Sequence, residues 1–236
     1  MSRPGPLPLP TPGDEAAWVR RHLGHLATEA AHDIEPSPSF RGGQQAADAA
    51  LAAYDVTGYA RDRSEVWPQR RRGASRLSPY IRHGLLSLSE VRNHVADGPS
   101  RDVSKDRDEL LWQEYARHLY ARLGPRLSQP LRAEPPTASR ASRRGESPWD
   151  RQMACVDLAL GELTEHGWMV NQTRMWLASQ WTVRNGWDWC EGEDVYFTHL
   201  LDGSRAANRL GWQWTVGTGT GRPYGFSRSQ VMRRAP

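Results

Sequence analysis

The sequence predicts an all-α protein, and two observations lead to this prediction. Apolar residues recur at helical spacing in several segments, most clearly over residues 106–123. No stretch of useful length alternates apolar and polar residues, as a half-exposed β-strand would. At 236 residues the chain is long enough to bury a core as one domain, with or without appendages.

Composition narrows the classes of function. The net charge of +4 and the pI of about 9.4 allow a polyanionic partner without requiring one. Cys155 and Cys190 lack the spacing of a CxxC motif or a metal site, so we expect two buried thiols and no metal site. No apolar run reaches membrane-spanning length, and the Pro-rich N-terminus lacks the apolar core of a signal peptide. We therefore expect a soluble, cytoplasmic protein without a membrane partner.

Helix-breaking residues divide the chain. Residues 1–39 contain a Pro-rich start, a short predicted helix over 14–32 and a second break at Pro36 and Pro38, so they are predicted to form a weakly structured N-terminal extension. Residues 40–236 are predicted to form the helical domain. Its expected helices span residues 44–54, 90–95, 106–123, 151–166, 169–183, 195–201 and 205–210.

The phrase Ser75–Tyr80 has the composition of a helix start that can bind an anion. Ser75 and Ser78 are helix-capping residue types, and Pro79 suits an early helical position. Hydroxyls and the free amides of a helix start would suit a pyrophosphate. The basic cluster Arg70–Arg72 just before it is either a solvated loop or a phosphate contact.

The segment 106–123 is the clearest predicted helix, with acidic residues early and arginine late to suit the helix dipole. Glu109, Trp112 and Gln113 share one face of it, at positions i, i+3 and i+4. Glu109 is therefore either a surface acid or a carboxylate at the mouth of a pocket.

Well over half of the 11 tryptophans lie between Gly167 and Trp214. Polar side chains interrupt them, and a Trp-rich interior must satisfy such groups with hydrogen bonds. Most cores use Leu and Ile rather than Trp, whose N–H needs a partner. The segment is therefore either an aromatic helical core or a site for a large, flat ligand.

Taken together, these phrases resemble the FAD-binding helical domain of the photolyase/cryptochrome family. The motifs SRLSP, ELLWQEYARHLY, GWMVNQTRMWLAS, DWCEGE, LLDGSRAAN and GWQWTVGTGT occur in the family's order between Phe40 and Tyr224. The resemblance implies an FAD cofactor, bound in a folded conformation inside the helical bundle. The residues it implies for cofactor binding are Tyr59, Ser75, Arg76, Leu77, Ser78, Trp168, Asn171, Arg174, Asp202, Ser204, Ala207 and Asn208.

Within that set, the resemblance assigns particular roles. Ser75, Leu77 and Ser78 would cradle the diphosphate. Arg174 and Asp202 would lie as a pair beside the isoalloxazine ring, with Asn208 facing flavin N5. For electron transfer to the flavin, Trp212 and Trp189 match the first two members of the family's tryptophan chain. The third member is either Trp149 or Trp187.

The resemblance also implies a substrate pocket for DNA repair, with Glu109, Trp112, Asn171, Met175 and Trp214 as its catalytic residues. The reaction, that of a carbon–carbon lyase, would be light-driven electron transfer from reduced flavin into a pyrimidine dimer flipped out of damaged DNA. Two indoles would sandwich the dimer and an acid would hydrogen-bond it.

Several departures from the family's pattern keep other functions open. The α/β domain that holds the family's antenna chromophore is absent from the sequence, so we expect no antenna chromophore in this chain. Ser204 replaces a second Asp, Gln113 and Gln172 replace arginines that flank the substrate pocket, and YGFSRSQVMRRAP replaces the family's RIFNP-like phrase. The alternatives are a flavoenzyme acting on a small molecule, a cryptochrome-like blue-light photoreceptor without repair activity, and a relative that has lost FAD.

Overall fold

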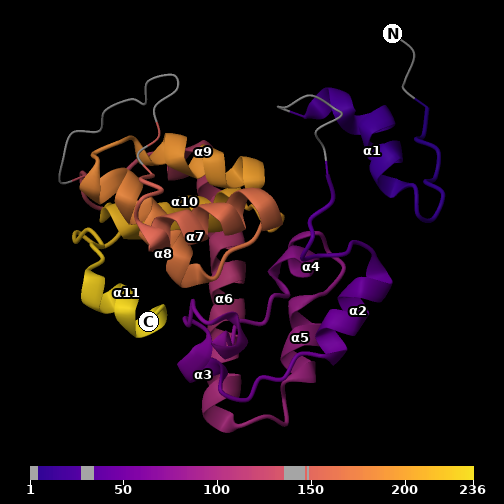
Figure 1. The fold of residues 1–236 in the computed structure, drawn as a ribbon, viewed down its shortest axis with the longest axis horizontal. Coiled ribbons are helices and arrows are strands. Elements are labelled where there is room, and N and C mark those ends of the chain that lie inside the picture. Colours follow the sequence, from indigo (N-terminus) through magenta and orange to yellow (C-terminus); the bar gives the residue numbers. More distant parts are fainter. Residues whose placement is uncertain (1–4, 28–34, 136–146, 148) are drawn as a thin grey trace. The chain divides into compact units, whose positions relative to one another are not determined.

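The computed structural model describes residues 5–27, 35–135, 147 and 149–236. The chain divides into two compact units, Met1–Arg41 and Gly42–Pro236. All regular elements in the described ranges are helices, which confirms the predicted all-α class (Figure 1). Across those same ranges, none of the helices combines the length and the apolarity needed to cross a membrane.

The first unit is built on one short helix, α1 (Glu15–Leu23), followed by a single 3-10 turn over Gly24–Leu26. The helix buries none of its own residues, and the indole of Trp18 donates a hydrogen bond to the carbonyl of Pro8 at 3.0 Å. The helix predicted for 14–32 is therefore too long. Residues 28–32 of that prediction lie outside the described ranges.

The second unit begins with four short helices and one long one. These are α2 (Gln44–Ala52), α3 (Tyr59–Asp62), α4 (Ser78–Arg82), α5 (Leu88–His94) and α6 (Ser100–Leu123). Ser87 caps α5 in a reciprocal capping box with Glu90, as helix-start chemistry predicts. The helix α6 begins at Ser100, six residues before the predicted start, because the polar residues that follow Pro99 continue the helix.

The rest of the unit supplies the aromatic core. Its helices are α7 (Ala154–Gly161), α8 (Asn171–Ser179), α9 (Trp189–His199), α10 (Arg205–Val216) and α11 (Arg228–Arg234), and π-helical turns over Glu162–His166 and Gln180–Arg184 extend α7 and α8. Helix α10 packs against α8 and α9, which are orange in Figure 1, and against α6, which is magenta. Buried residues of these elements form the main core, with five tryptophans among them: Trp149, Trp181, Trp187, Trp189 and Trp212.

Two predicted helix boundaries in this region are wrong, and in both places a glycine lies inside the helix. The sequence suggested a break at Glu191–Glu193, yet α9 begins at Trp189, where the Asp188 side chain accepts hydrogen bonds from two helix-start amides. Gly192 lies inside that helix. A Cβ there would stand 2.3 Å from the Trp212 ring and 2.9 Å from the Trp181 ring, so packing rather than a turn requires this glycine. Helix α10 likewise runs on to Val216 and includes the GWQW phrase.

Candidate functional site

The start of α4 brings together predicted cofactor residues from two distant segments. Arg76, a non-glycine residue, has a left-handed backbone with φ of 58° just before the helix. The Trp168 indole donates a hydrogen bond to the Ser78 hydroxyl at 3.1 Å, and the Arg76 guanidinium lies 5.2 Å from the Trp168 ring centre. Ser75 Oγ accepts from the Leu77 amide at 3.4 Å. A strained residue held in place by such contacts is typical of a functional site.

The predicted flavin-side ion pair joins Asp202, in the loop before α10, to Arg174 on α8. Arg174 Nη2 lies 2.7 Å from Asp202 Oδ2, and the Asp202 side chain is only 6% exposed. Two side chains of the α4 region hold this loop: Arg82 Nε donates to the Gly203 carbonyl at 2.6 Å, and His83 Nε2 lies 2.9 Å from the Leu201 carbonyl. The predicted diphosphate cradle and the predicted isoalloxazine pair are therefore parts of one connected structure.

Three buried polar atoms near this loop have no hydrogen-bond partner among the described residues. They are Asp202 Oδ1, Asn208 Nδ2 and Trp212 Nε1. Burying such groups without partners is costly, so native structures normally satisfy them. One is an acceptor and two are donors, and the edge of a flavin ring carries both an N–H and several oxygen and nitrogen acceptors. The residues present therefore fit the flavin that the sequence predicts.

The other predicted cofactor residues fall into three settings. Ser204 accepts a hydrogen bond from the Ala207 amide at 3.4 Å and so caps α10, a structural task that the sequence alone did not assign to it. Ala207 and Asn171 are exposed. Tyr59 is buried in a separate small core with Val56, Val95 and Val103, and burial raises the pKa of its phenol. A role at the cofactor stays a prediction for each of these four.

The predicted substrate residues lie on the surface of α6 and α10. Trp112 is 62% exposed and Trp214 is 44% exposed, which is unusual for tryptophans in so aromatic a protein. Glu109 forms ion pairs with Lys105 at 2.9 Å and with Arg63 at 3.3 Å, so it is not a lone surface acid. Met175 is half-buried on α8. Since α10 packs against both α6 and α8, the structure draws these residues to neighbouring elements.

The three arginines of the basic cluster Arg70–Arg72, before α4, differ in burial. Arg72 is nearly buried, lies 2.5 Å from Glu162 and donates to the Val66 carbonyl at 2.7 Å, so it is neither a solvated residue nor a free phosphate contact. Burial raises the pKa of Glu162 above its ordinary value, although Arg72 opposes that rise. Arg70 and Arg71 remain exposed.

The predicted electron-transfer residues Trp212 and Trp189 are both buried, at 2% and 3% exposure. The Trp212 ring contacts Tyr196, with centroids 4.9 Å apart, and Trp181, at 6.3 Å. Within the described part of the chain, Trp189 makes no direct ring contact with Trp212. Sequence reasoning did not predict that Trp181 packs on Trp212. Its position just past the end of α8, between two other tryptophans of the cluster, was the available signal.

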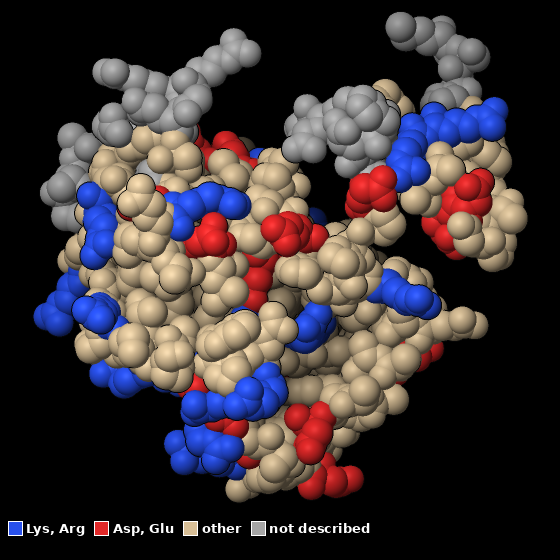
Figure 2. All heavy atoms as spheres, in the orientation of Figure 1, with Lys and Arg blue, Asp and Glu red and all other residues tan. Residues whose placement is uncertain are grey.

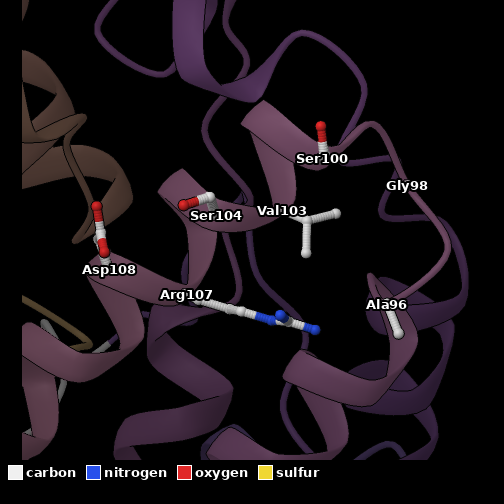
Figure 3. A pocket seen from close by; sticks show the side chains of 7 residues that line it. All are labelled: Ala96, Gly98, Ser100, Val103, Ser104, Arg107 and Asp108. Atoms are coloured by element: carbon white, nitrogen blue, oxygen red, sulfur yellow. The ribbon is translucent and has the colours of Figure 1, made fainter.

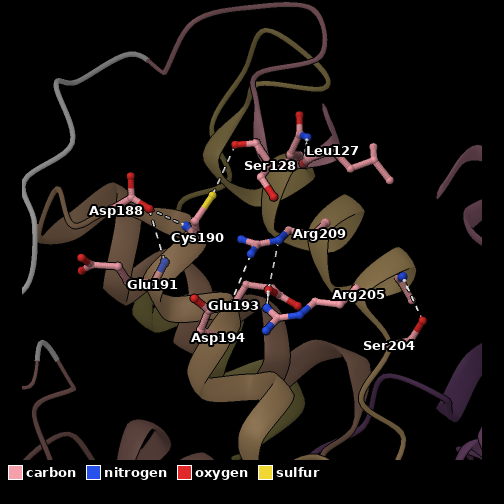
Figure 4. A network of polar contacts seen from close by, with 12 residues as sticks. Leu127, Ser128, Asp188, Cys190, Glu191, Glu193, Asp194, Ser204, Arg205 and Arg209 are labelled. Carbon is pink, nitrogen blue, oxygen red and sulfur yellow. Dashed lines mark hydrogen bonds and ion pairs between the residues drawn. The ribbon is translucent and has the colours of Figure 1, made fainter. Parts of the chain in front are cut away.

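A polar network joins α9 to α10 beside these indoles (Figure 4). Glu193 is fully buried and pairs with Arg209 at 3.1 Å, and Arg205 bonds to both Glu193 and Asp194. Burial raises the pKa of Glu193 against the opposing pull of Arg209 and Arg205. At the edge of the network, burial raises the pKa of the free thiol of Cys190 to about 11.

The two cysteines are less enclosed than the sequence predicts. Cys155 and Cys190 are free thiols, and both are half-buried rather than buried. Within the described residues, no group of three or more His, Cys, Asp and Glu side chains is arranged to hold a metal ion.

A surface pocket lies at one end of α6. It has a volume of about 420 Å³ and is lined by α6 residues such as Ser104 and Arg107 together with Ala96 and Gly98 (Figure 3). A neighbouring pocket of about 390 Å³ includes Arg63 and Lys105. Neither contains a predicted cofactor residue, so neither is the flavin site.

The sequence of residues 106–233 matches the family described as the FAD binding domain of DNA photolyase. The chain belongs to this family. It is 32% identical over 198 residues to the deoxyribodipyrimidine photo-lyase of Vibrio cholerae, an alignment that covers 76% of the chain and 42% of the relative. It is 33% identical over 226 residues to a deoxyribodipyrimidine photo-lyase of Thermus thermophilus, covering 90% of the chain and 50% of the relative.

Solved structures of similar fold include a class III photolyase from Agrobacterium tumefaciens, with a TM-score of 0.69 and 25% identity over 92% of the chain and 43% of that structure. A cryptochrome from Synechocystis has a TM-score of 0.71 at 23% identity, over 83% of the chain and 44% of that structure, which shows the fold alone. The chain thus spans half or less of the length of these photolyases.

Membership of the photolyase family confirms three predictions: the family itself, its helical fold and FAD as the cofactor. The structure shows the contacts of two residues, Ser204 and Gln172, that depart from the photolyase pattern. Ser204 is a helix cap. Gln172 donates a hydrogen bond to the Tyr224 hydroxyl at 3.0 Å, and the Tyr224 ring lies 5.2 Å from Trp214. Gln172 therefore holds the aromatic residue beside Trp214.

Proposed function

We propose that this chain is the FAD-binding part of a photolyase that repairs pyrimidine dimers in DNA by light-driven electron transfer. The observation that carries the proposal is the pair of exposed indoles, Trp112 and Trp214, on the packed helices α6 and α10. Exposed aromatic rings stack on nucleobases with little dependence on sequence. Relatives named deoxyribodipyrimidine photo-lyase support the same reaction.

The cofactor would be held by the connected residues of α4, α8 and α10. Ser78 and the α4 start would bind its diphosphate, and Arg174, Asp202 and Asn208 would bind its ring. The chemistry that FAD supplies when bound is one-electron transfer after absorption of blue light. Asp202 holds the Arg174 guanidinium in one position, where it would be available to bind the cofactor.

The substrate would be a dimer extruded from the duplex, because the target bond is inaccessible inside the stack. Trp112 and Trp214 would stack on its bases, while Met175 and Asn171 complete the pocket from α8. Lys105 and Arg63 fix the direction of the Glu109 carboxylate, which would accept a hydrogen bond from the base edge.

Basic side chains provide a surface for the DNA backbone. Figure 2 shows them gathered on the side of the second unit that carries α3 and α11 in Figure 1. The exposed members from these and the adjoining segments are Arg61, Arg70, Arg71, Arg228 and Arg233. Cations clustered in this way neutralise phosphates and release counterions. We therefore expect damaged-DNA binding that weakens steeply with salt.

Repair of a thymine-dimer oligonucleotide under blue light tests the proposal. Trp112→Ala should abolish dimer loss and leave the visible flavin spectrum unchanged, because Trp112 is exposed and its ring packs edge-on against Tyr115 of the same helix. Leu111→Ala is the matched control, since Leu111 is the adjacent residue on α6 and is 66% exposed. Undiminished repair by the Trp112→Ala protein would remove the substrate assignment.

The alternatives carry less support. Nothing in the comparisons favours a small-molecule substrate, and the likeness to a cryptochrome extends to the fold only. A flavin spectrum with photoreduction but without dimer loss would favour the photoreceptor function. A cytoplasmic location remains a prediction from the sequence.

A further inference from the structure

The end of α4 holds the loop that carries Asp202 at both neighbours of that residue. Arg82 Nε donates a hydrogen bond to the Gly203 carbonyl at 2.6 Å, and His83 Nε2 lies 2.9 Å from the Leu201 carbonyl. The partners are 121 and 118 residues apart in the sequence. Asp202 therefore lies between two backbone groups that are each held by a side chain from the end of the same helix.

Helix α4 links this loop firmly to Ser78. Its three middle residues are buried: Pro79, Tyr80 and Ile81. Ser78 is its first residue and accepts the hydrogen bond of the Trp168 indole, and Arg82 is its last residue. Four helical steps separate Ser78 from Arg82, which is about 6 Å along the axis. A helix this short and this well buried moves as one piece, so the position of Ser78 and that of the loop depend on each other.

A second path joins Ser78 to the loop through the residues just before α8. Trp168 bonds to Ser78, and the carbonyl of the preceding residue, Gly167, accepts a hydrogen bond from the Leu201 amide at 2.8 Å. Gly167 has a φ of 67°, and a Cβ there would lie 2.9 Å from the Leu201 side chain, so the close approach requires a glycine. Removal of one path should therefore shift the loop without releasing it.

The ion pair between Arg174 and Asp202 does not fix the carboxylate by itself. Arg174 Nη2 lies 2.7 Å from Asp202 Oδ2, while Arg174 Nε donates to the Met169 carbonyl at 3.1 Å. Asp202 Oδ1 is buried and has no hydrogen-bond partner in the described part of the chain. A bidentate pair would hold both carboxylate oxygens, whereas a single contact leaves the other oxygen free to turn. The direction of Oδ1 is therefore set by the backbone of the loop.

We propose that Arg82 is a positioning residue for the flavin ring. Its bond to Gly203 sets the direction in which Asp202 presents Oδ1 to the cofactor, and Arg82 acts through the loop rather than by touching the ring. The inference rests on the proposed function, which puts the ring beside Asp202 and the diphosphate at Ser78. Residues that support a binding group from behind fix its geometry and so its affinity. The ring half of FAD should therefore depend on Arg82, and the adenine half should not.

Calorimetric titration of the flavin-free protein in the dark tests this inference, with riboflavin as the ring half and ADP as the other half. Arg82→Met and Arg82→Gln both remove the charge and keep an unbranched side chain. The glutamine Nε2 stands as many bonds from the backbone as the arginine Nε, so only glutamine keeps a donor for Gly203. Arg82→Met should bind riboflavin about tenfold more weakly than the unaltered protein, and Arg82→Gln should recover most of this loss. ADP affinity should not change in either variant.

Arg92→Met is the matched control. Arg92 is an exposed arginine on α5 that donates to Asn93 of the same helix, so the same chemical change should leave both affinities as they are. Equal riboflavin affinity in Arg82→Met and Arg82→Gln would overturn the proposal. An equal loss of riboflavin and ADP affinity in Arg82→Met would also overturn it, because the effect would then be a general loss of structure.

A second pair of variants reaches the same loop if Arg82→Met folds poorly. His83→Leu removes the contact with the Leu201 carbonyl, and His83→Gln keeps an N–H donor for it. His83 is exposed, so neither change disturbs the core. Riboflavin binding should weaken in His83→Leu and recover in His83→Gln. Equal riboflavin affinity in these two variants would overturn the role of the loop.

These titrations need neither light nor DNA, which separates them from dimer repair. If the expected riboflavin pattern appears in a protein that repairs no dimers, the proposed function fails and the positioning role of Arg82 stands. If the protein repairs dimers but Arg82→Met and Arg82→Gln bind riboflavin equally, the positioning role alone fails.

Discussion

The two sides of the proposed active site are built in opposite ways. On the cofactor side, specific bonds tie groups across long sequence separations: Trp168 to Ser78, Arg82 to Gly203 and Arg174 to Asp202. On the substrate side, Trp112 and Trp214 are exposed, and Glu109 is held by surface ion pairs. The contacts of the cofactor side therefore help to hold the fold together, whereas the side chains of the substrate side lie exposed on its surface. Substitutions should separate the two sides by their effect on stability.

The largest loss of unfolding free energy is expected from Asp202→Ala. It removes the carboxylate that pairs with Arg174 and leaves that guanidinium, 21% exposed, without this ion-pair partner. Removal of one member of a largely buried pair costs about 3 kcal/mol of unfolding free energy, and flavin binding should be lost as well. Urea unfolding and the visible spectrum measure both effects.

Asp108→Asn is the control for that substitution. Asp108 is 58% exposed and lies 3.9 Å from Lys105, so the change should cost less than about 1 kcal/mol. A comparable loss in both variants would mean that the cofactor side is no more a part of the fold than the surface of α6.

Gly192→Ala should give the next largest loss of stability. The added methyl would lie 2.3 Å from one Trp212 atom and 2.5 Å from another, and the Trp212 ring is itself buried. Overpacking of this kind costs about 1–3 kcal/mol. Gly211→Ala in α10 is the matched control, because no atom lies within 4 Å of the position its methyl would take and alanine favours a helix by about 0.5–1 kcal/mol. Opposite shifts in melting temperature are expected, and two shifts of the same sign would contradict the packing.

The pH dependence of stability should also differ between buried and exposed carboxylates. Burial raises the pKa of Glu193 above its ordinary value of 4.5, so the folded state binds more protons than the unfolded state just above that pH. The contribution of Glu193 is therefore fully present below pH 4.5 and is lost as the pH rises through the folded pKa. Glu193→Gln should reduce this fall in unfolding free energy, measured by urea unfolding from about pH 4 to 7.

Glu90 should contribute a pH dependence of stability with the opposite sign to that of Glu193. Hydrogen bonds from the Ser87 hydroxyl and amide lower the pKa of Glu90 in the folded state. Its contribution is present above pH 4.5 and is lost as the pH falls through the folded pKa. Glu90→Gln should therefore change the slope only on the acid side, and an effect confined to higher pH would contradict the assignment.

The features predicted from the sequence are those that depend on local order. The family, the helical class and FAD could be predicted, because the motifs that carry them are contiguous in the chain. The start of α9 could not, since Gly192 looked like a turn until its contact with Trp212 was visible. The packing of Trp181 could not be predicted for the same reason. Its partners Trp149 and Trp212 lie some thirty residues away on either side, and only packing brings them together.

The smallest effect on stability is expected on the substrate side, from Glu109→Gln. Glu109 is 36% exposed, and its ion pairs with Lys105 and Arg63 contribute less than about 1 kcal/mol at such a surface. The flavin spectrum should not change. Dimer repair should fall, because the neutral amide is a weaker acceptor than the carboxylate and the two cations no longer orient it.

Lys105→Gln tests how much of the effect of Glu109→Gln on repair comes from the lost ion pair. It removes one of the two ion pairs but keeps the carboxylate, so repair should fall less than in Glu109→Gln. Repair assays with a thymine-dimer oligonucleotide, together with urea unfolding, distinguish the outcomes. If Glu109→Gln instead destabilises the protein as much as Asp202→Ala, then Glu109 belongs to the fold. The contrast between a cofactor side that is part of the fold and an exposed substrate side would then not hold for Glu109, the α6 residue that pairs with Arg63 next to α3.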